Sequence, residues 1–112
     1  MKIVLKKIAV LDVVILQDQV LKYIENKTQF LNYRNFDKYC FDLIAIENLE
    51  AIFKVLRTKI ETDKPKVNIS LSISQSVVLH KCYSDIPTDK TKQTFEVMLR
   101  LGGQLHKSLI NI

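Results

Sequence analysis

Two cysteines and two histidines are the residues from which this chain could build a metal site or a catalytic thiol–imidazole pair: Cys40, His80, Cys82 and His106. Thiolate and imidazole suit zinc, but structural zinc sites take their ligands from close pairs such as CxxC or HxxxH, and the chain has neither. His80 and Cys82 stand two residues apart, so on a helix they face different directions. We therefore expect no metal and no cofactor, with half-buried thiols and partly exposed imidazoles. A catalytic thiol–imidazole pair remains an alternative interpretation, because the sequence does not show which of these side chains lie close together.

Other residue types that carry enzyme chemistry are sparse. The glycine pair Gly102-Gly103 lies inside an apolar periodic stretch, not between a strand and a helix where a phosphate-binding loop would place it. Each glycine costs a helix roughly 0.5–1 kcal/mol relative to alanine, so the pair indicates a close helix crossing or a break. The carboxylates are scattered, with no pair at glycosidase or metal-dyad spacing. We expect a protein that is not an enzyme.

The segment from residue 30 to residue 41 gathers five of the nine aromatic residues, interleaved with lysine, arginine and asparagine. Aromatic faces beside cations suit single-stranded nucleic acid, and the same residue types concentrate binding energy in protein interfaces. A third interpretation is that the aromatics pack onto the end of a helical bundle, because aromatic residues are core residues first. The residues that we expect to bind a partner are Phe30, Tyr33, Arg34, Phe36, Lys38 and Tyr39.

The chain has 112 residues and a formal net charge of +5, carried mostly by lysine, since only three of its 17 basic residues are arginine. Lysine suits solubility and loose attraction to polyanions, whereas bidentate reading of phosphate or guanine usually uses arginine. The charge is uneven: residues 1–35 carry +3, residues 36–63 carry −2 and residues 64–112 carry +4. An acidic middle can pair with basic ends inside the fold or between subunits, so the charge gives only weak support to nucleic-acid binding.

The start of the chain is basic and then apolar, as in a signal peptide, but Asp12 interrupts the apolar run and no small-residue cleavage site follows. The run is also shorter than the roughly 20 apolar residues of a membrane-spanning helix. Two cysteines without an export signal are typical of reduced thiols. We expect a cytoplasmic protein without a membrane partner.

The clearest element is an amphipathic helix over residues 41–60, with apolar residues three and four apart on one face. Asn35 or Asp37 can cap its start, and Pro65 follows its end. The stripe needs a covering partner, because burying each large residue is worth about 1.5–3 kcal/mol. Its members are Phe41, Ala45, Leu49, Ile52, Leu56 and Ile60.

A second helix is expected over residues 8–24, which are apolar almost all round. The β-branched residues there also fit a strand, but a strand of that length would be unusual. Because the helix is apolar on more than one face, we expect a second subunit to cover part of it. Its predicted inner face consists of Leu11, Val14, Ile15, Leu21 and Ile24.

Residues 66–71 alternate strictly between apolar and polar, the mark of a half-buried strand. A capping box at Ser72 and Gln75 then starts a helix over residues 73–84. A last helix follows, with Thr88 or Asp89 as its expected cap. The apolar face of this last helix consists of Phe95, Met98, Gly102, Leu105 and Leu109.

These elements predict a mainly α, single-domain four-helix bundle over residues 1–112. The two halves align weakly at an offset of 64, and if they are repeats, residues 2–6 and 66–71 form a two-stranded ribbon. We expect a non-enzymatic protein–protein interaction or assembly module that self-associates. The alternatives are a small basic nucleic-acid-binding protein and a thiol or metal protein. By composition alone, the chain resembles accessory or structural products of bacteriophages and mobile elements.

Overall fold

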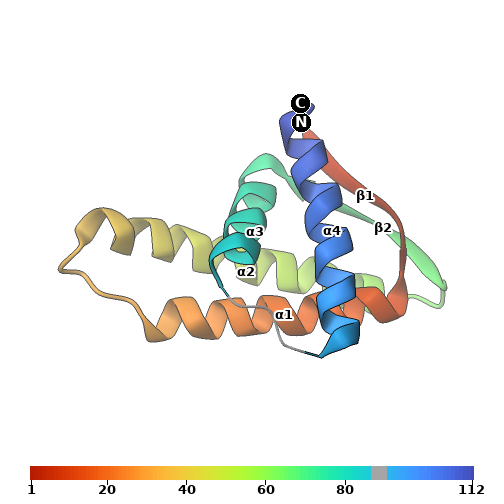
Figure 1. Cartoon of the computed structure of the whole chain (residues 1–112), viewed down its shortest axis with the longest axis horizontal. Coiled ribbons are helices and arrows are strands. Elements are labelled where there is room, and N and C mark those ends of the chain that lie inside the picture. The colour runs from red at the N-terminus through yellow and green to blue at the C-terminus, as the bar shows by residue number, and fades with distance from the viewer. Residues whose placement is uncertain (87–90) are drawn as a thin grey trace.

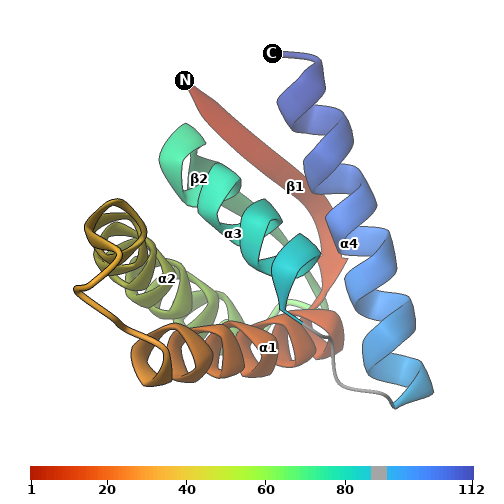
Figure 2. The same cartoon turned by 60° about the vertical axis from the view of Figure 1, so that its left-hand side comes forward.

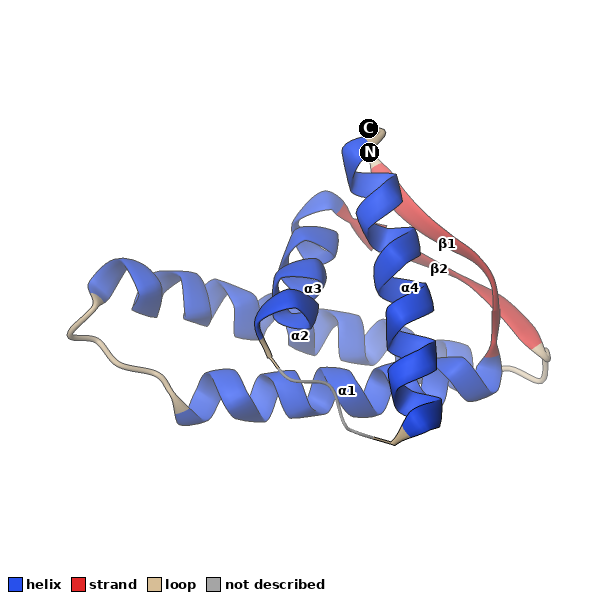
Figure 3. Cartoon of the chain, in the orientation of Figure 1, coloured by secondary structure: helices blue, strands red, loops and turns tan. Residues whose placement is uncertain are grey.

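The computed structural model describes residues 1–86 and 91–112 of the chain. It contains four helices and a two-stranded antiparallel sheet, in the order strand, helix, helix and again strand, helix, helix (Figure 1 and Figure 3). The elements are β1 (Lys2–Ala9), α1 (Val10–Gln29), α2 (Phe36–Ile60), β2 (Lys66–Ser72), α3 (Ile73–Asp85) and α4 (Lys92–Ile110). The predicted mainly α fold with a small ribbon is confirmed. Within the described ranges, no helix has the length and apolar character needed to cross a membrane.

α1 and α2 form a long hairpin that projects beyond the other elements (Figure 1). Asn35 caps α2 as predicted, because its side-chain oxygen accepts a hydrogen bond from the backbone N–H of Lys38 at 3.4 Å. The helix runs from Phe36 to Ile60, with Glu61 as its C-cap. The molecule extends 45 Å along its longest axis, and the loop of the hairpin lies at one end of that axis (Figure 1).

The apolar stripe of α2 faces the core for most of its length, as predicted. Its first member is an exception, because Phe41 is exposed and the neighbouring Asp42 is buried. Ile60, its last member, is only partly buried against the core. The fully buried members of the stripe are Ala45, Leu49, Ile52 and Leu56.

The predicted inner face of α1 is wrong. Leu11, Val14 and Leu21 are exposed, and only Ile15 and Ile24 of the predicted set pack partly against the core. The helix is apolar almost all round, so its pattern does not select a face; packing against α2 selects it. The residues of α1 that are buried are Val13, Leu16, Gln19, Val20 and Tyr23.

The sheet covers the core with one face and has a bulge in its first strand. The register of β1 against β2 shifts between Leu5 and Ile8, where β1 contains one extra residue. Lys7 lies in this bulge with a φ of 55°, and its backbone N–H donates a hydrogen bond to Asn68 Oδ1 at 2.9 Å. β1 continues through the bulge and ends at Ala9, beyond its predicted end at residue 6. The inner face consists of Ile3, Leu5, Ile8, Val67, Ile69 and Leu71.

α3 begins at the predicted capping box. The backbone N–H of Gln75 donates to the Ser72 hydroxyl at 3.1 Å, and the Gln75 side chain accepts from the Ser72 N–H at 2.9 Å. The helix packs against α2 on one side and α4 on another (Figure 2).

α4 lies beside β1 and α3 (Figure 2). Its cap is Thr91, whose hydroxyl accepts from the Thr94 N–H at 3.4 Å; the predicted caps Thr88 and Asp89 lie outside the described residues. Phe95 is exposed, so its predicted place on the inner face is wrong. The buried stripe of α4 is rotated away from Phe95 and consists of Val97, Met98, Leu101, Gly102 and Leu105.

Gly102 marks the predicted close crossing of two helices, and α4 continues through Gly102 and Gly103 without a break. A Cβ atom added to Gly102 would lie 2.5 Å from Cε1 of Tyr83 on α3. The same atom added to Gly103 would have no described neighbour within 4 Å. The crossing therefore depends on Gly102 alone.

Candidate docking surface at the tip of the helical hairpin

The hairpin tip, residues 30–44, comprises the loop after α1 and the first turns of α2. Two asparagines shape the loop by accepting backbone hydrogen bonds: Asn32 Oδ1 from the N–H of Arg34 at 3.0 Å, and Asn35 Oδ1 from the N–H of Lys38. These bonds follow the local pattern by which asparagine side chains form turns and caps. The loop is therefore held in place by its own side chains.

Three aromatic side chains of the tip extend into solvent. Phe30, Tyr33 and Phe36 are 59%, 72% and 64% exposed, so the interpretation that they pack onto the end of the bundle is wrong for all three. Tyr39 is half-buried, with its ring centroid 6.2 Å from that of Phe36. The protruding hairpin causes this exposure, because the other helices do not extend over its loop (Figure 1).

The exposed apolar surface continues into the first turns of α2. Leu43 and Ile44 are exposed there, beside the partly exposed Phe41. Single exposed apolar residues are normal, but a concentration of them marks an interaction site. The exposed large apolar residues of the tip are Phe30, Tyr33, Phe36, Phe41, Leu43 and Ile44.

A buried carboxylate ties the two arms of the hairpin together just below the tip. Asp42 accepts hydrogen bonds from Nζ of Lys38 at 2.6 Å and from Nζ of Lys27, at the end of α1, at 3.2 Å. Burial acts to raise the pKa of the Asp42 carboxyl, but the hydrogen bonds and charges of the two lysines outweigh it and hold that pKa below its ordinary value. The carboxylate therefore stays ionised at neutral pH.

This ion pair changes the electrostatics of the tip. Lys27 and Lys38 are the cations that a single-stranded nucleic acid would need beside the aromatic rings, but both bind Asp42. Lys27 also lies 5.8 Å from the centroid of the Phe41 ring. In the described part of the tip, Arg34 is the one cation with no acidic partner. The tip is thus apolar and aromatic rather than strongly basic.

The predicted apolar stripe of α2 leaves out Asp42 and so misses this site. Asp42 lies three residues before Ala45 and seven before Leu49, a spacing that puts it on the same face of the helix as those buried residues. The spacing of four between Lys38 and Asp42 was a visible signal for one of its two ion pairs. The contact with Lys27 comes from a different helix and is not readable from local spacing.

A groove of about 600 Å³ lies between the tip and the end of α3. Phe30 and Lys38 line it from the hairpin, and Asp85 and Ile86 line it from the other side. The tip therefore offers both protruding rings and a concave surface, which is the combination from which protein interfaces build their central contacts.

The cysteines and histidines do not meet in one place. His80 Nε2 and His106 Nδ1 lie 3.0 Å apart, and their stacked rings join α3 to α4. Cys82 is buried, and burial raises the pKa of its thiol to about 11, whereas Cys40 is half-buried on α2. Among the described residues, no group of three or more His, Cys, Asp or Glu side chains could hold a metal ion. The histidine pair was not predictable, because the two residues belong to different helices.

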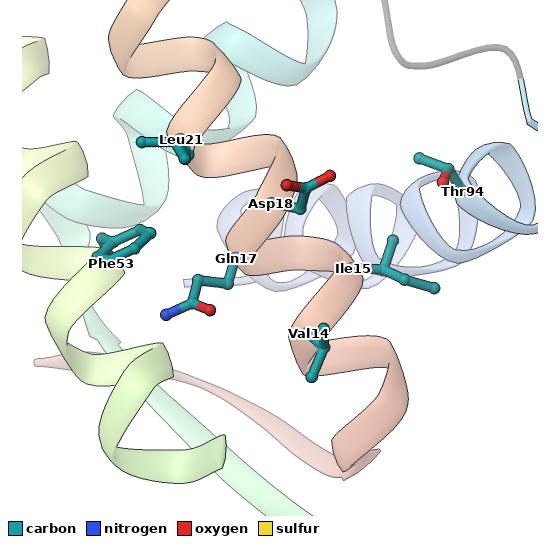
Figure 4. A pocket seen from close by; sticks show the side chains of 7 residues that line it. All are labelled: Val14, Ile15, Gln17, Asp18, Leu21, Phe53 and Thr94. Atoms are coloured by element: carbon teal, nitrogen blue, oxygen red, sulfur yellow. The ribbon is translucent and has the colours of Figure 1, made fainter. Parts of the chain in front are cut away.

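A second apolar surface lies on the outer side of α1. A shallow pocket of about 270 Å³ is lined there by Val14, Ile15 and Leu21, with Phe53 of α2 on one side and Thr94 of α4 on the other (Figure 4). Val14 and Leu21, which were predicted to face the core, are exposed here and give α1 an apolar outer surface. Comparison with protein-family models, curated proteins and solved structures found no match to this chain. The functional argument therefore depends on the arrangement of its own residues.

Proposed function

We propose that this chain is a non-enzymatic protein-interaction module that docks a protein partner, and first of all a second copy of itself, through the hairpin tip. The observation that carries this proposal is the exposure of the Phe30, Tyr33 and Phe36 rings at the end of a protruding hairpin. Their exposure leaves apolar area that a partner would remove from water.

The size of the tip fits a docking surface. An aromatic side chain buries about 150–250 Å², and since 59–72% of each of the three is exposed, together they supply roughly 300–500 Å² of the about 800 Å² that each partner contributes to a standard interface. The exposed Leu43 and Ile44 add to this area. The loop that carries them is fixed by Asn32 and Asn35, so little conformational entropy is lost on binding.

Charge supports a second copy as the partner. The chain as a whole carries +5, so two copies repel each other over most of their surface. Residues 36–63 carry −2, and within the tip the charges of Arg34 and Lys38 are balanced by those of Asp37 and Asp42. Contact through the tip therefore brings the least basic part of each copy together.

Nucleic acid is less well supported as the occupant of the tip. Stacking platforms combine aromatic faces with free cations that follow the backbone, and the tip keeps only Arg34 for that purpose. Affinity for single strands is expected to be low there and to change little with the tip residues.

Sedimentation at tens of micromolar tests the proposal. The wild-type chain should show about twice its mass of 13.0 kDa, and the double variant Tyr33→Ala, Phe36→Ala should return to 13.0 kDa. Phe95→Ala is the matched control, because Phe95 is also an exposed phenylalanine near the start of its helix but lies on α4. The control should keep the wild-type mass.

Val14→Glu separates the tip from the outer face of α1. If that single change produces monomer while the tip variant stays dimeric, self-association uses α1 and the tip assignment is wrong. A wild-type mass of 13.0 kDa at every concentration would remove self-association altogether.

A further inference from the structure

Four lysines line one pocket, three of them from residues 59–66 and one from β1. The start of β2, the end of α2 and the end of β1 lie at the end of the molecule opposite the hairpin tip (Figure 1). The pocket has a volume of about 270 Å³. Its lysines come from the β1 bulge, the last turn of α2, the loop after α2 and the first residue of β2: Lys7, Lys59, Lys64 and Lys66. We call this feature the basic pocket.

The backbone fixes the position of Lys7 in this pocket. Lys7 has a φ of 55°, a conformation that residues other than glycine seldom adopt, and Asn68 Oδ1 holds it there through the Lys7 N–H. Bulges of this kind redirect a side chain that would otherwise follow the alternation of the strand. Asn68 also lines the pocket, and this bond uses a lone pair of its one side-chain acceptor atom, Oδ1.

What distinguishes these lysines from other unpaired basic residues, such as Arg34, is that all four line one pocket and none of them has an acidic partner there. Lys27 and Lys38 bind Asp42, and Lys81 binds Asp85 at 3.1 Å. Within residues 1–86 and 91–112, no ion pair is formed by any of the four lysines, and no acidic residue lines the pocket.

The nearest acids along the chain do not neutralise the basic pocket. Glu61 is paired with Arg57 at 3.3 Å, and Asp63 is exposed and does not line the pocket. Four lysines without acidic partners therefore line one pocket, and an anion bound there is attracted by their combined positive charge.

We infer that the basic pocket binds the phosphate backbone of duplex nucleic acid without reading its sequence. Lysine acts on phosphate as a point charge, and the pocket contains no arginine or aromatic side chain with which to read a base. Four positive charges exceed what one phosphate monoester needs, whereas duplex DNA carries about one negative charge per 1.7 Å. This site is separate from the hairpin tip and does not depend on the proposed docking function.

Binding of a short labelled DNA duplex, measured by fluorescence anisotropy at several salt concentrations, tests the inference. With four lysine contacts, log K should fall against log salt with a slope of about −3 to −4, a loss of roughly 100-fold between about 50 and 200 mM. The double variant Lys64→Gln, Lys66→Gln should reduce that slope by about 2. Lys92→Gln, Lys107→Gln removes the same charge from α4 and should leave the slope near its wild-type value.

Other results of these binding measurements would overturn the inference. Equal losses in the pocket variant and in the α4 control would show that net charge alone attracts DNA, and would overturn the site. Binding of polyglutamate as tightly as the duplex at the same salt would overturn the assignment to phosphate.

The tip variant Tyr33→Ala, Phe36→Ala should bind DNA like the wild type, so a failure of the docking proposal and a failure of this one are distinguishable. Melting curves of all variants exclude loss through unfolding.

Discussion

At the scale of single residues, Asp42 is the side chain on which the hairpin most depends. Its carboxylate is buried, joins α2 to α1 through Lys27 and also pairs with Lys38, one turn earlier on α2. Asp42→Asn should lower the free energy of unfolding by about 2–3 kcal/mol at neutral pH. Breaking a buried pair typically costs about 3–5 kcal/mol, and the exposure of Lys38 to solvent reduces that figure. Chemical denaturation of both proteins measures the difference.

The pH dependence of this loss follows from the lowered pKa of Asp42. The folded-state pKa lies below the ordinary value of 3.8, so the charge stabilises the fold at any pH above that value, and the stabilisation is lost as the pH falls through the folded-state pKa. The gap between wild type and Asp42→Asn should therefore be constant near neutral pH and close in acid. Lys38→Gln is the control and should cost less than about 1 kcal/mol, because Lys38 is exposed. A gap that persists unchanged in acid would contradict this account.

Side-chain contacts were predictable where both partners lie within a few residues of each other in the sequence. Asn35 as a cap and the Ser72–Gln75 box follow from local spacing, and both form as expected. The Asp42–Lys27 ion pair joins residues of different helices, so its existence depends on how those helices pack. The exposure of the aromatic tip has the same origin, since it depends on how far the hairpin projects.

At the scale of elements, the crossing of α3 and α4 depends on one glycine of an adjacent pair. Gly102→Ala should destabilise the protein by about 1–3 kcal/mol, because the new Cβ meets the Tyr83 ring in a packed contact. Gly103→Ala should instead stabilise it by about 0.5–1 kcal/mol, since alanine favours the helix and no described atom lies within 4 Å. Thermal unfolding of the two variants measures both changes. Equal effects at the two positions would refute the close crossing.

The helices differ in how far their sequence determines their packing. The stripe of α2 is narrow, so its buried residues from Ala45 to Leu56 were predictable. α1 is apolar almost all round, and the pattern therefore carries no information on which side the core lies. Val14 and Leu21 were expected inside and are exposed. The same excess of apolar surface is why α1 remains a candidate for contact with a second copy.

At the scale of the whole molecule, two chemically different surfaces lie at opposite ends of a 45 Å body (Figure 1). The hairpin tip is aromatic and nearly neutral, and the basic pocket is lined by four lysines. Under the two proposals above, a protein partner at one end leaves the other end free for nucleic acid. The fold that keeps these ends apart is closed by the pairing of β1 with β2, which joins residues distant in the sequence.

Leu5 of β1 lies where that closure meets the helical core. It lines a small apolar cavity together with Leu16 of α1, Leu79 of α3 and Met98 of α4, so side chains of three helices and one strand surround that cavity. Leu5→Ala should cost about 2–5 kcal/mol, a large part of the roughly 5–15 kcal/mol that stabilises a domain. Because β1, α1, α3 and α4 meet at this cavity and α1 packs on α2, urea unfolding should stay a single transition at a lower midpoint.

Val4→Ala is the matched control for Leu5→Ala, because Val4 is the adjacent residue of β1 and its side chain points out of the core. The control should change the free energy of unfolding by less than about 1 kcal/mol, in keeping with substitutions at surface positions. Two separate transitions in Leu5→Ala would mean that the α1–α2 hairpin unfolds independently of α3 and α4. That result would contradict a single core closed by the sheet, and it would make the hairpin a unit that could dock a partner without the rest of the fold.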